Sequence, residues 1–168
     1  EANAGNDLHR ISRTAEKAFR WTLLFGFPTA SFFLAFADEL GILLFGSTQA
    51  GQILRIMAPL APLMYLDNVT DNLLKGLDQQ MYSLEYNLTD SLMRVILIAV
   101  FIPIFGIKAY IVILFASEIY NASLSIGRLL KVTSLRVDFI DWILYPAVLG
   151  GLAFYAMTLL KKLFLWRF

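Results

Sequence analysis

The stretch from Ala58 to Gly76, APLAPLMYLDNVTDNLLKG, decides how this chain folds. It is helix-length and mostly apolar, yet it contains Pro59, Pro62, Asp67 and Asp71, where a plain membrane anchor would carry leucines. In hydrocarbon, an unpaired backbone or side-chain polar group is costly, so such residues are tolerated only against neighbouring helices or a water-filled cavity. The stretch therefore predicts a bundle of several membrane helices with a polar interior.

The composition supports the same fold class. Of the 168 residues, 58% are hydrophobic and 16% are charged, and the mean hydropathy is +0.66. Soluble domains are usually about half apolar and a quarter charged, so we expect an all-α polytopic membrane bundle. The net charge of +1 gives no electrostatic basis for a nucleic-acid partner. The chain has no cysteine and only one histidine, His9, so no metal site and no cofactor are expected.

Five segments are long and apolar enough to span a bilayer, which takes about 20 residues. We expect these helices at about residues 14–38, 49–77, 80–102, 107–132 and 139–161. Pro28 is expected to kink the first helix, and Asp38-Glu39 to end it. The piece Leu40–Phe45 is too short to span. The run Pro103–Gly106 predicts a tight turn, because proline and glycine together end a helix strongly.

The distribution of lysine and arginine predicts the orientation in the membrane. One side receives eight of them: Arg10, Arg13, Lys17, Arg20, Lys75, Arg128, Lys131 and Arg136. The other side receives four: Lys108, Lys161, Lys162 and Arg167. The first side is predicted to face the cytoplasm. Because the sequence begins at Glu1 and shows no signal segment, we expect a fragment of a larger transporter, with residues 163–168 opening a further helix.

Two carboxylates and a lysine share one face of the second expected helix. Asp67, Asp71 and Lys75 follow one another at intervals of four residues. Two adjacent carboxylates in a poorly hydrated site repel each other, so such a pair is able to take up a proton or a sodium ion. The alternative is structural, with the acids holding the bundle together and Lys75 neutralising Asp71. Both interpretations stay open from the sequence.

The next two helices carry polar residues at similar steps. Asp90 and Arg94 have the spacing of an intrahelical ion pair, and Asn87 extends their stripe, while the fourth helix carries Glu118 and Asn121. One stripe alone is typical of a seam between helices, but stripes on three successive helices indicate a shared cavity. In the functional interpretation Arg94 lines the path of an anionic headgroup; in the structural one the pair keeps the helices in register.

Arg55 and two aspartate-containing motifs are further candidates for a functional role. Arg55 lies near the opposite end of the second helix, where it either faces the substrate path or extends to the interface. Tyr65-Leu66-Asp67 and Gly76-Leu77-Asp78 resemble the motifs of intramembrane aspartyl proteases only loosely, because both spacings differ. We therefore expect no enzymatic activity and no catalytic residue.

Three long stretches carry a family resemblance. They are AFRWTLLFGFPTASFFLAFADELGILLFG, ILRIMAPLAPLMYLDNVTDNLLKGLDQQ and YNLTDSLMRVILIAVFIPIFGIKAYIVILFASEIYNASLSIGRLLKVT. Together they closely resemble the C-terminal half of stage V sporulation protein B-like polysaccharide exporters, of the multidrug/oligosaccharidyl-lipid/polysaccharide (MOP) flippase superfamily. The resemblance covers Glu1 to about Thr133. The sequence departs from the usual Leu-Gly after Lys75-Gly76, where it has Leu77-Asp78.

The resemblance implies a fold and a transport function. Such proteins have about fourteen helices in two lobes and move lipid-linked cell-wall or polysaccharide precursors outward by alternating access. Residues 1–133 would then be part of the C-terminal lobe, and residues 134–168 a trailing transmembrane helix with a truncated tail. The implied partners are the lipid bilayer, a lipid-linked saccharide, a coupling proton or sodium ion and the missing N-terminal lobe. The implied location is the bacterial plasma membrane, crossed several times.

Two other functions remain open from the sequence. One is a multidrug or cation antiporter of the same superfamily, for which the acids would matter and the arginines would be dispensable. The other is a transport-inactive membrane scaffold for cell-wall or spore assembly.

Overall fold

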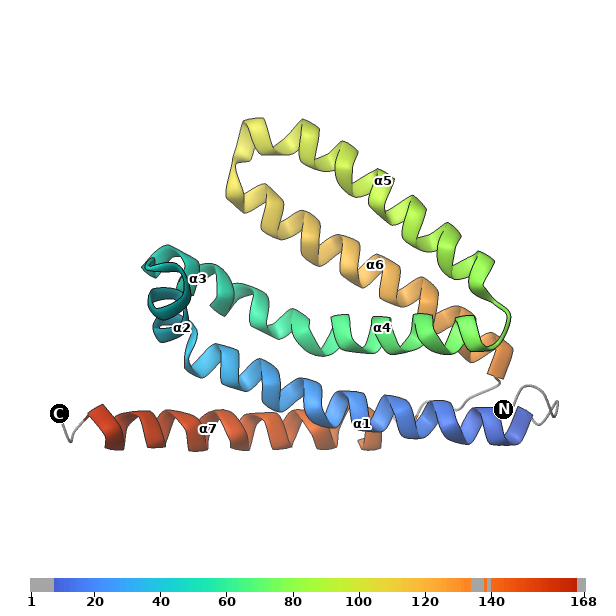
Figure 1. The fold of residues 1–168 in the computed structure, drawn as a ribbon, viewed down its shortest axis with the longest axis horizontal. Coiled ribbons are helices and arrows are strands. Elements are labelled where there is room, and N and C mark those ends of the chain that lie inside the picture. Colours follow the sequence, from blue (N-terminus) through green and yellow to red (C-terminus); the bar gives the residue numbers. More distant parts are fainter. Residues whose placement is uncertain (1–7, 134–137, 139, 166–168) are drawn as a thin grey trace. The chain divides into compact units, whose positions relative to one another are not determined.

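The computed structural model describes residues 8–133, 138 and 140–165, and these are helical almost throughout, with no strand among them. The elements are α1 (Leu8–Ala35), α2 (Ala37–Phe45), α3 (Thr48–Met57), the 3₁₀ turn η1 (Ala58–Leu60), α4 (Ala61–Gly76), α5 (Gln80–Phe105), α6 (Ile107–Thr133), the π-helical turn η2 (Ile140–Leu144) and α7 (Tyr145–Leu165) (Figure 1). The expected all-α class is confirmed. Some residues of the sequence predictions lie outside the described part: the side chain of His9, Arg136, and 166–168 with Arg167.

Three described helical stretches are long and apolar enough to cross a membrane: Gln80–Phe105, Ile107–Thr133 and Ile140–Leu163. A fourth span results if α1 and α2 are counted together, although they are bent by 73° at Phe36. The expected helices at 80–102, 107–132 and 139–161 thus match α5, α6 and η2 with α7, each of which runs a little further than expected. α5 continues through Pro103 to Phe105 and ends at Gly106, whose φ of 62° is left-handed.

The segment expected as one helix at 49–77 is divided into α3, η1 and α4. The division falls on the prolines: Pro59 lies in the first turn of η1, and Pro62 is the second residue of α4. Proline is tolerated at the start of a helical segment, because the N–H that it lacks has no acceptor there. The opening stretch therefore forms a broken helix.

The first expected helix ends at Ala35, and Asp38-Glu39 begin a new helix instead of ending the old one. Both acids lie in the first turn of α2, where the positive end of the helix dipole stabilises a carboxylate. Pro28 lies inside α1, which continues past it. Leu40–Phe45 belongs to the nine-residue α2, which is too short to span by itself, as expected.

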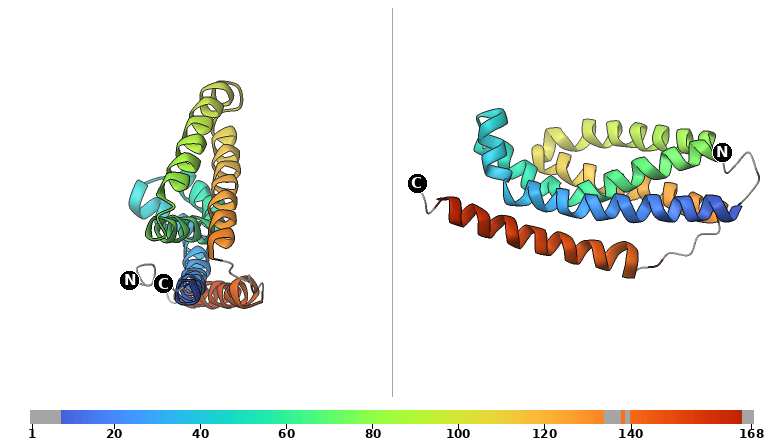
Figure 2. Two further views of the ribbon diagram at one scale, coloured as in Figure 1. Left: turned by 90° about the vertical axis from the view of Figure 1, so that its right-hand side faces the viewer. Right: turned by 60° about the horizontal axis from the view of Figure 1, so that its bottom comes forward.

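The chain divides into two compact units, which are described separately. Unit 1 comprises Glu1–Phe19 and Leu63–Arg136. In it α5 and α6 form an antiparallel hairpin joined at Gly106, and α4 runs beside them (Figures 1 and 2). Its buried apolar side chains include Phe19, Leu74 and Leu129.

Unit 2 comprises Arg20–Pro62 and Val137–Phe168, and its helices are joined by a close backbone contact, a hydroxyl-to-carbonyl hydrogen bond and two ion pairs, Arg55–Asp38 and Lys161–Glu39. Gly41 of α2 and Gly51 of α3 meet so closely that a Cβ built on Gly41 would lie 2.3 Å from the Gly51 backbone nitrogen. The Ser31 hydroxyl of α1 donates to the Gly150 carbonyl of α7 at 2.7 Å. Small residues and hydroxyls of this kind are typical of packed membrane helices.

Candidate polar transport site

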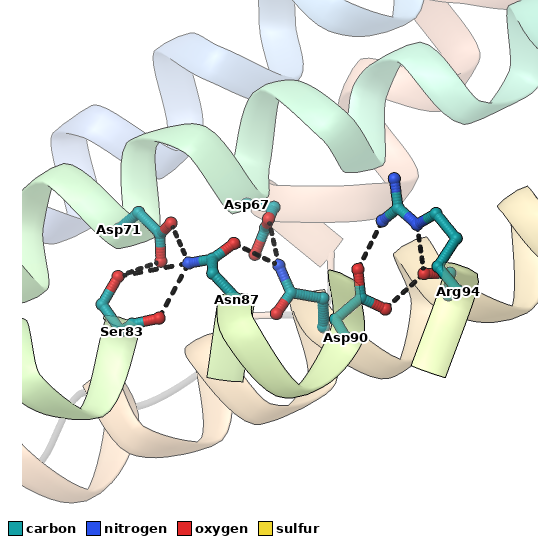
Figure 3. Close-up of polar contacts among 8 residues, drawn as sticks. Asp67, Asp71, Ser83, Asn87, Asp90 and Arg94 are labelled. Carbon is teal, nitrogen blue, oxygen red and sulfur yellow. Dashed lines mark hydrogen bonds and ion pairs between the residues drawn. The ribbon is translucent and has the colours of Figure 1, made fainter. Parts of the chain in front are cut away.

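The polar stripes of α4, α5 and α6 meet inside unit 1 and form two neighbouring hydrogen-bonded groups, here together called the polar network (Figure 3). One group joins Asp67, Asp71, Ser83, Asn87 and Asn121, and the other joins Asp90, Arg94 and Ser117. Each helix contributes residues three or four positions apart, which places them on one face of that helix. The sequence predicts that the three stripes face a shared interior, and the hydrogen bonds of the network show which residues of the three helices meet there.

At one end of the network, Asp71 is held by α5. The Ser83 hydroxyl donates to Asp71 Oδ1 at 2.8 Å, and the Asn87 amide donates to Asp71 Oδ2 at 2.8 Å. Among the described ion pairs none joins Lys75 to Asp71. The carboxylate is therefore satisfied by a hydroxyl and an amide of the neighbouring helix, and not by the lysine one turn away.

In the middle, Asp67 of α4 and Asn121 of α6 are buried against each other. The Asn121 amide donates to Asp67 Oδ2 at 2.9 Å and to Asn87 Oδ1 at 3.2 Å, so it links all three helices. Three buried oxygens here have no hydrogen-bond partner in the described part of the chain: Asp67 Oδ1, Asn121 Oδ1 and Ser125 Oγ. The Ser125 side chain lies beside the Asp67 carboxylate. A buried unpaired oxygen is costly, so this set of acceptors suits a small cation.

At the other end, Asp90 and Arg94 form the expected ion pair within α5. The Ser117 hydroxyl of α6 donates to Asp90 Oδ1, and Arg94 Nε donates to Ser117 Oγ at 2.8 Å. Asp90 is only 3% exposed. Every charged group in this triangle has a partner, and the triangle joins α5 to α6. These contacts fit the structural interpretation, and a role of Arg94 in the substrate path stays a prediction.

Two candidate residues lie outside these hydrogen-bonded groups. Arg55 belongs to unit 2, where its guanidinium pairs with Asp38 at 2.6 Å, and both side chains are about half exposed. Glu118 is partly buried on α6 and interacts electrostatically with Asp67, Asp90 and Arg94, but it makes none of the described hydrogen bonds. Glu118 therefore affects the network through its charge and not through a described hydrogen bond.

A polar contact that the sequence analysis missed lies at the α4–α5 turn. Arg128 of α6 donates to Gln79 Oε1 at 2.5 and 3.1 Å, and its guanidinium lies 3.6 Å from the ring centre of Tyr82. Such stacking on an aromatic face stabilises an arginine. Only the position of Arg128 near the end of its helix could be predicted from the sequence, since its partners are 46 and 49 residues away.

An open pocket of 530 Å³ with a mixed polar and apolar lining lies beside Asp71, between α4 and α5. Its lining includes the charged groups of Asp71 and Lys75 and the amides of Gln80 and Asn87. No cluster of three or more His, Cys, Asp or Glu side chains suited to a metal ion occurs among residues 8–133, 138 and 140–165. The pocket thus presents both signs of charge, with hydroxyl and amide groups between them.

A family model described as MatE matches residues 1–100, which include α1 to α4 and most of α5. No curated protein and no solved structure matches the chain.

Proposed function

We propose that this chain, which belongs to the MatE family of the MOP superfamily of membrane transporters, is part of the C-terminal lobe of a flippase. Its substrate would be a lipid-linked cell-wall or polysaccharide precursor, moved outward across the bacterial plasma membrane. The chain is a multi-pass membrane protein. The assignment to the stage V sporulation protein B-like exporters rests on the sequence resemblance described above.

The observation that carries this proposal is the polar network with the pocket beside it. The 530 Å³ pocket offers the Lys75 ammonium to a phosphate and the Asp71 and Asn87 side chains to sugar hydroxyls. Asp71 is fixed by Ser83 and Asn87, so its orientation is set before a ligand arrives. A saccharide phosphate needs such a mixture of cation, hydroxyl and amide groups.

The broken helix α3–η1–α4 supports alternating access. Transporter sites are often formed by discontinuous helices, and here the interruption contains Pro59 and Pro62. The chain passes from unit 2 to unit 1 between Pro62 and Leu63, directly at the interruption. We infer that this point bends as the lobe rocks against an N-terminal lobe supplied by the rest of the transporter.

The unpaired oxygens around Asp67 support a coupling cation. A proton on Asp67 would remove a buried charge, and a sodium ion would be bound by Asp67 Oδ1 with the neighbouring Ser125 hydroxyl, because hard cations prefer oxygen ligands. Either cation changes the charge of a group that touches α4 and α6. Binding or release of the cation would thus alter how these helices pack.

The test is transport by the intact protein in liposomes, followed with a fluorescent lipid-linked saccharide under a sodium or a proton gradient. The wild type is expected to move the lipid outward under one of the two gradients. The Asp67→Asn variant is expected to lose at least about ten-fold in rate, since a 1.4 kcal/mol change in a barrier is ten-fold. Glu85→Gln, which alters an exposed acid of α5, serves as the control and is expected to keep the rate.

Other outcomes would contradict the proposal. Absence of movement under any gradient favours the membrane scaffold. An Arg94→Gln variant that loses lipid movement but exports a cationic dye favours the multidrug antiporter, as does dye export by the wild type without lipid movement. The acids Asp67, Asp71 and Asp90 outnumber Arg94 in the network, which is the one observation on the side of that alternative.

A further inference from the structure

An apolar groove of 420 Å³ lies between α5 and α6, next to the turn that joins them. Leu97, Phe101 and Phe105 of α5 line one wall, and residues of α6 from Lys108 to Ala116 line the other. Both helices are long and apolar enough to span the membrane. The groove is separate from the polar network, which begins at Ser117 and Arg94, one turn further from the α5–α6 turn.

The length of the groove matches one leaflet of a bilayer. Eight residues separate Leu97 from Phe105, and eight separate Lys108 from Ala116, so at 1.5 Å per residue each wall is about 12 Å long. Half of the roughly 30 Å hydrocarbon core is about 15 Å. The groove therefore follows a single leaflet from the interface towards the midplane, which is the course of a lipid acyl chain.

A cation lies at the interfacial end of this groove. Lys108 contributes its aliphatic stem to the lining, and lysines in such positions extend their ammonium group to the interface. Among the described ion pairs none includes Lys108. The residue also stands in the first turn of α6, which has no acidic residue, although the helix dipole disfavours a cation there. An anion beside Lys108 would balance both the ammonium and the helix terminus.

We propose that this groove binds an anionic phospholipid of the surrounding bilayer. Its phosphate would pair with the Lys108 ammonium beside the first turn of α6, and one acyl chain would lie against Phe101, Phe105 and Ala109. The apolar walls disfavour a saccharide headgroup, and Lys108, the one charged residue in the lining of the groove, complements a phosphate. The bound lipid would fix the α5–α6 turn to the membrane surface. This inference does not depend on what the protein transports.

Native mass spectrometry of the intact protein, released from nanodiscs, tests the proposal. The nanodiscs contain equal amounts of phosphatidylglycerol and phosphatidylcholine with identical acyl chains. The wild type is expected to retain one phosphatidylglycerol in preference to phosphatidylcholine. Lys108→Gln is expected to lower this retention about five-fold, since one lysine near an anionic surface is worth a factor of that size. Lys108→Arg is expected to restore it.

Two further variants separate charge from shape. Ala109→Phe keeps Lys108 but fills the groove, and it is expected to lower the retention of both lipids. Lys131→Gln removes an exposed lysine at the other end of the same helix, and it is expected to change nothing. Circular dichroism of each variant confirms that it has folded.

The proposal is wrong if both phospholipids are retained equally and neither Lys108→Gln nor Ala109→Phe has an effect. It is also wrong if Lys131→Gln lowers retention as much as Lys108→Gln, since the lipid would then respond to total charge. A third arm adds a polyprenyl phosphate to the nanodiscs. If that lipid displaces phosphatidylglycerol from the wild type but not from Ala109→Phe, the groove takes the lipid tail of a transport substrate instead.

Discussion

Unit 1 and unit 2 hold their helices together by different means. In unit 1, charged and amide side chains of α4, α5 and α6 interlock, as in the contact of Asn121 with Asp67 and Asn87. In unit 2, backbones approach each other directly where Gly41 meets Gly51, and the Ser31 hydroxyl donates to the Gly150 carbonyl. The ion pairs of unit 2, Arg55 with Asp38 and Lys161 with Glu39, have partly exposed side chains, unlike the buried Asp67 and Asp90 of unit 1. Both kinds of contact, hydrogen bonds between polar side chains and close packing at small residues, are known for membrane helices, because these gain little from the hydrophobic effect when they associate inside lipid.

The difference has a functional consequence. A contact between backbones has one geometry and resists change, whereas a hydrogen-bonded network is able to exchange partners when a proton, an ion or a ligand arrives. Unit 1 also contains the three unpaired oxygens. We therefore expect unit 1 to respond to ligands and unit 2 to act as a rigid body. Four substitutions test this distinction.

The largest effect is expected for Arg94→Leu. This change leaves the buried Asp90 carboxylate, which is 3% exposed, without its counter-ion. Removing one partner of a buried ion pair costs about 4 kcal/mol of unfolding free energy. The measurement is SDS-induced unfolding of the protein in mixed micelles, followed by circular dichroism.

The double variant Asp90→Leu/Arg94→Leu is the control for this experiment. Because it removes both charges, it is expected to differ from the wild type by only about 1 kcal/mol. If the double variant is as unstable as Arg94→Leu, the ion pair itself contributes to stability and the desolvation argument for unit 1 fails.

The second effect concerns the contact of α2 with α3. A Cβ on Gly41 would lie 2.3 and 2.5 Å from backbone atoms of Gly51, which have no rotamer to change, so the two helices must separate. Gly41→Ala is expected to lower the unfolding free energy by about 3 kcal/mol. Gly151→Ala, where no neighbouring atom lies within 4 Å, is expected to raise it by up to about 1 kcal/mol. Equal effects of the two variants would contradict the close crossing.

Much of unit 1 could be predicted from the sequence, because its signals are local. Spacings of four residues placed Asp90 beside Arg94 and put Asp67 and Asp71 on one face, and hydropathy located α5 and α6. The pairing between helices could not be predicted, since nothing in the sequence says that Asn121 meets Asp67 across 54 positions.

The errors of prediction concentrate in unit 2 and at the broken helix. Asp38-Glu39 were expected to end a helix, yet they begin one, because acids suit both the end of an apolar span and the first turn of a helix. For Arg55 the sequence did not indicate its partner, Asp38 of another helix, and its place on the substrate path or at the interface stays a prediction. Gly41 and Gly51 gave no signal at all, because two isolated glycines in different helices have no periodicity.

The third prediction concerns the α4–α5 turn, which positions Asp71 opposite Ser83 and Asn87. Asp78 adopts a φ of 58°, in the left-handed region, and is the only non-glycine residue with positive φ in the described part of the chain. This is the place where the resemblance led us to expect glycine. Asp78→Gly is therefore expected to be about 1 kcal/mol more stable than Asp78→Ala, since a Cβ is disfavoured in this conformation.

Both variants remove the same carboxylate. The difference between their unfolding free energies therefore reports only the backbone conformation at position 78. The measurement is the same unfolding titration. If Asp78→Ala is the more stable of the two, the turn does not hold the left-handed conformation in the membrane protein.

The smallest effect is expected for Ser31→Ala in unit 2. The Ser31 hydroxyl donates both to Gly150 of α7 and to Phe27 of its own helix, at 2.7 and 2.9 Å. Interhelical hydrogen bonds in membranes contribute about 0.6 kcal/mol on average, because the separated helices find other partners. Thr29→Val is the control, since the Thr29 hydroxyl donates within its own helix to Phe25, and it is expected to change the unfolding free energy little. A loss for Ser31→Ala close to that of Arg94→Leu would mean that unit 2, too, depends on polar side chains, and the two units would then not differ in the way proposed.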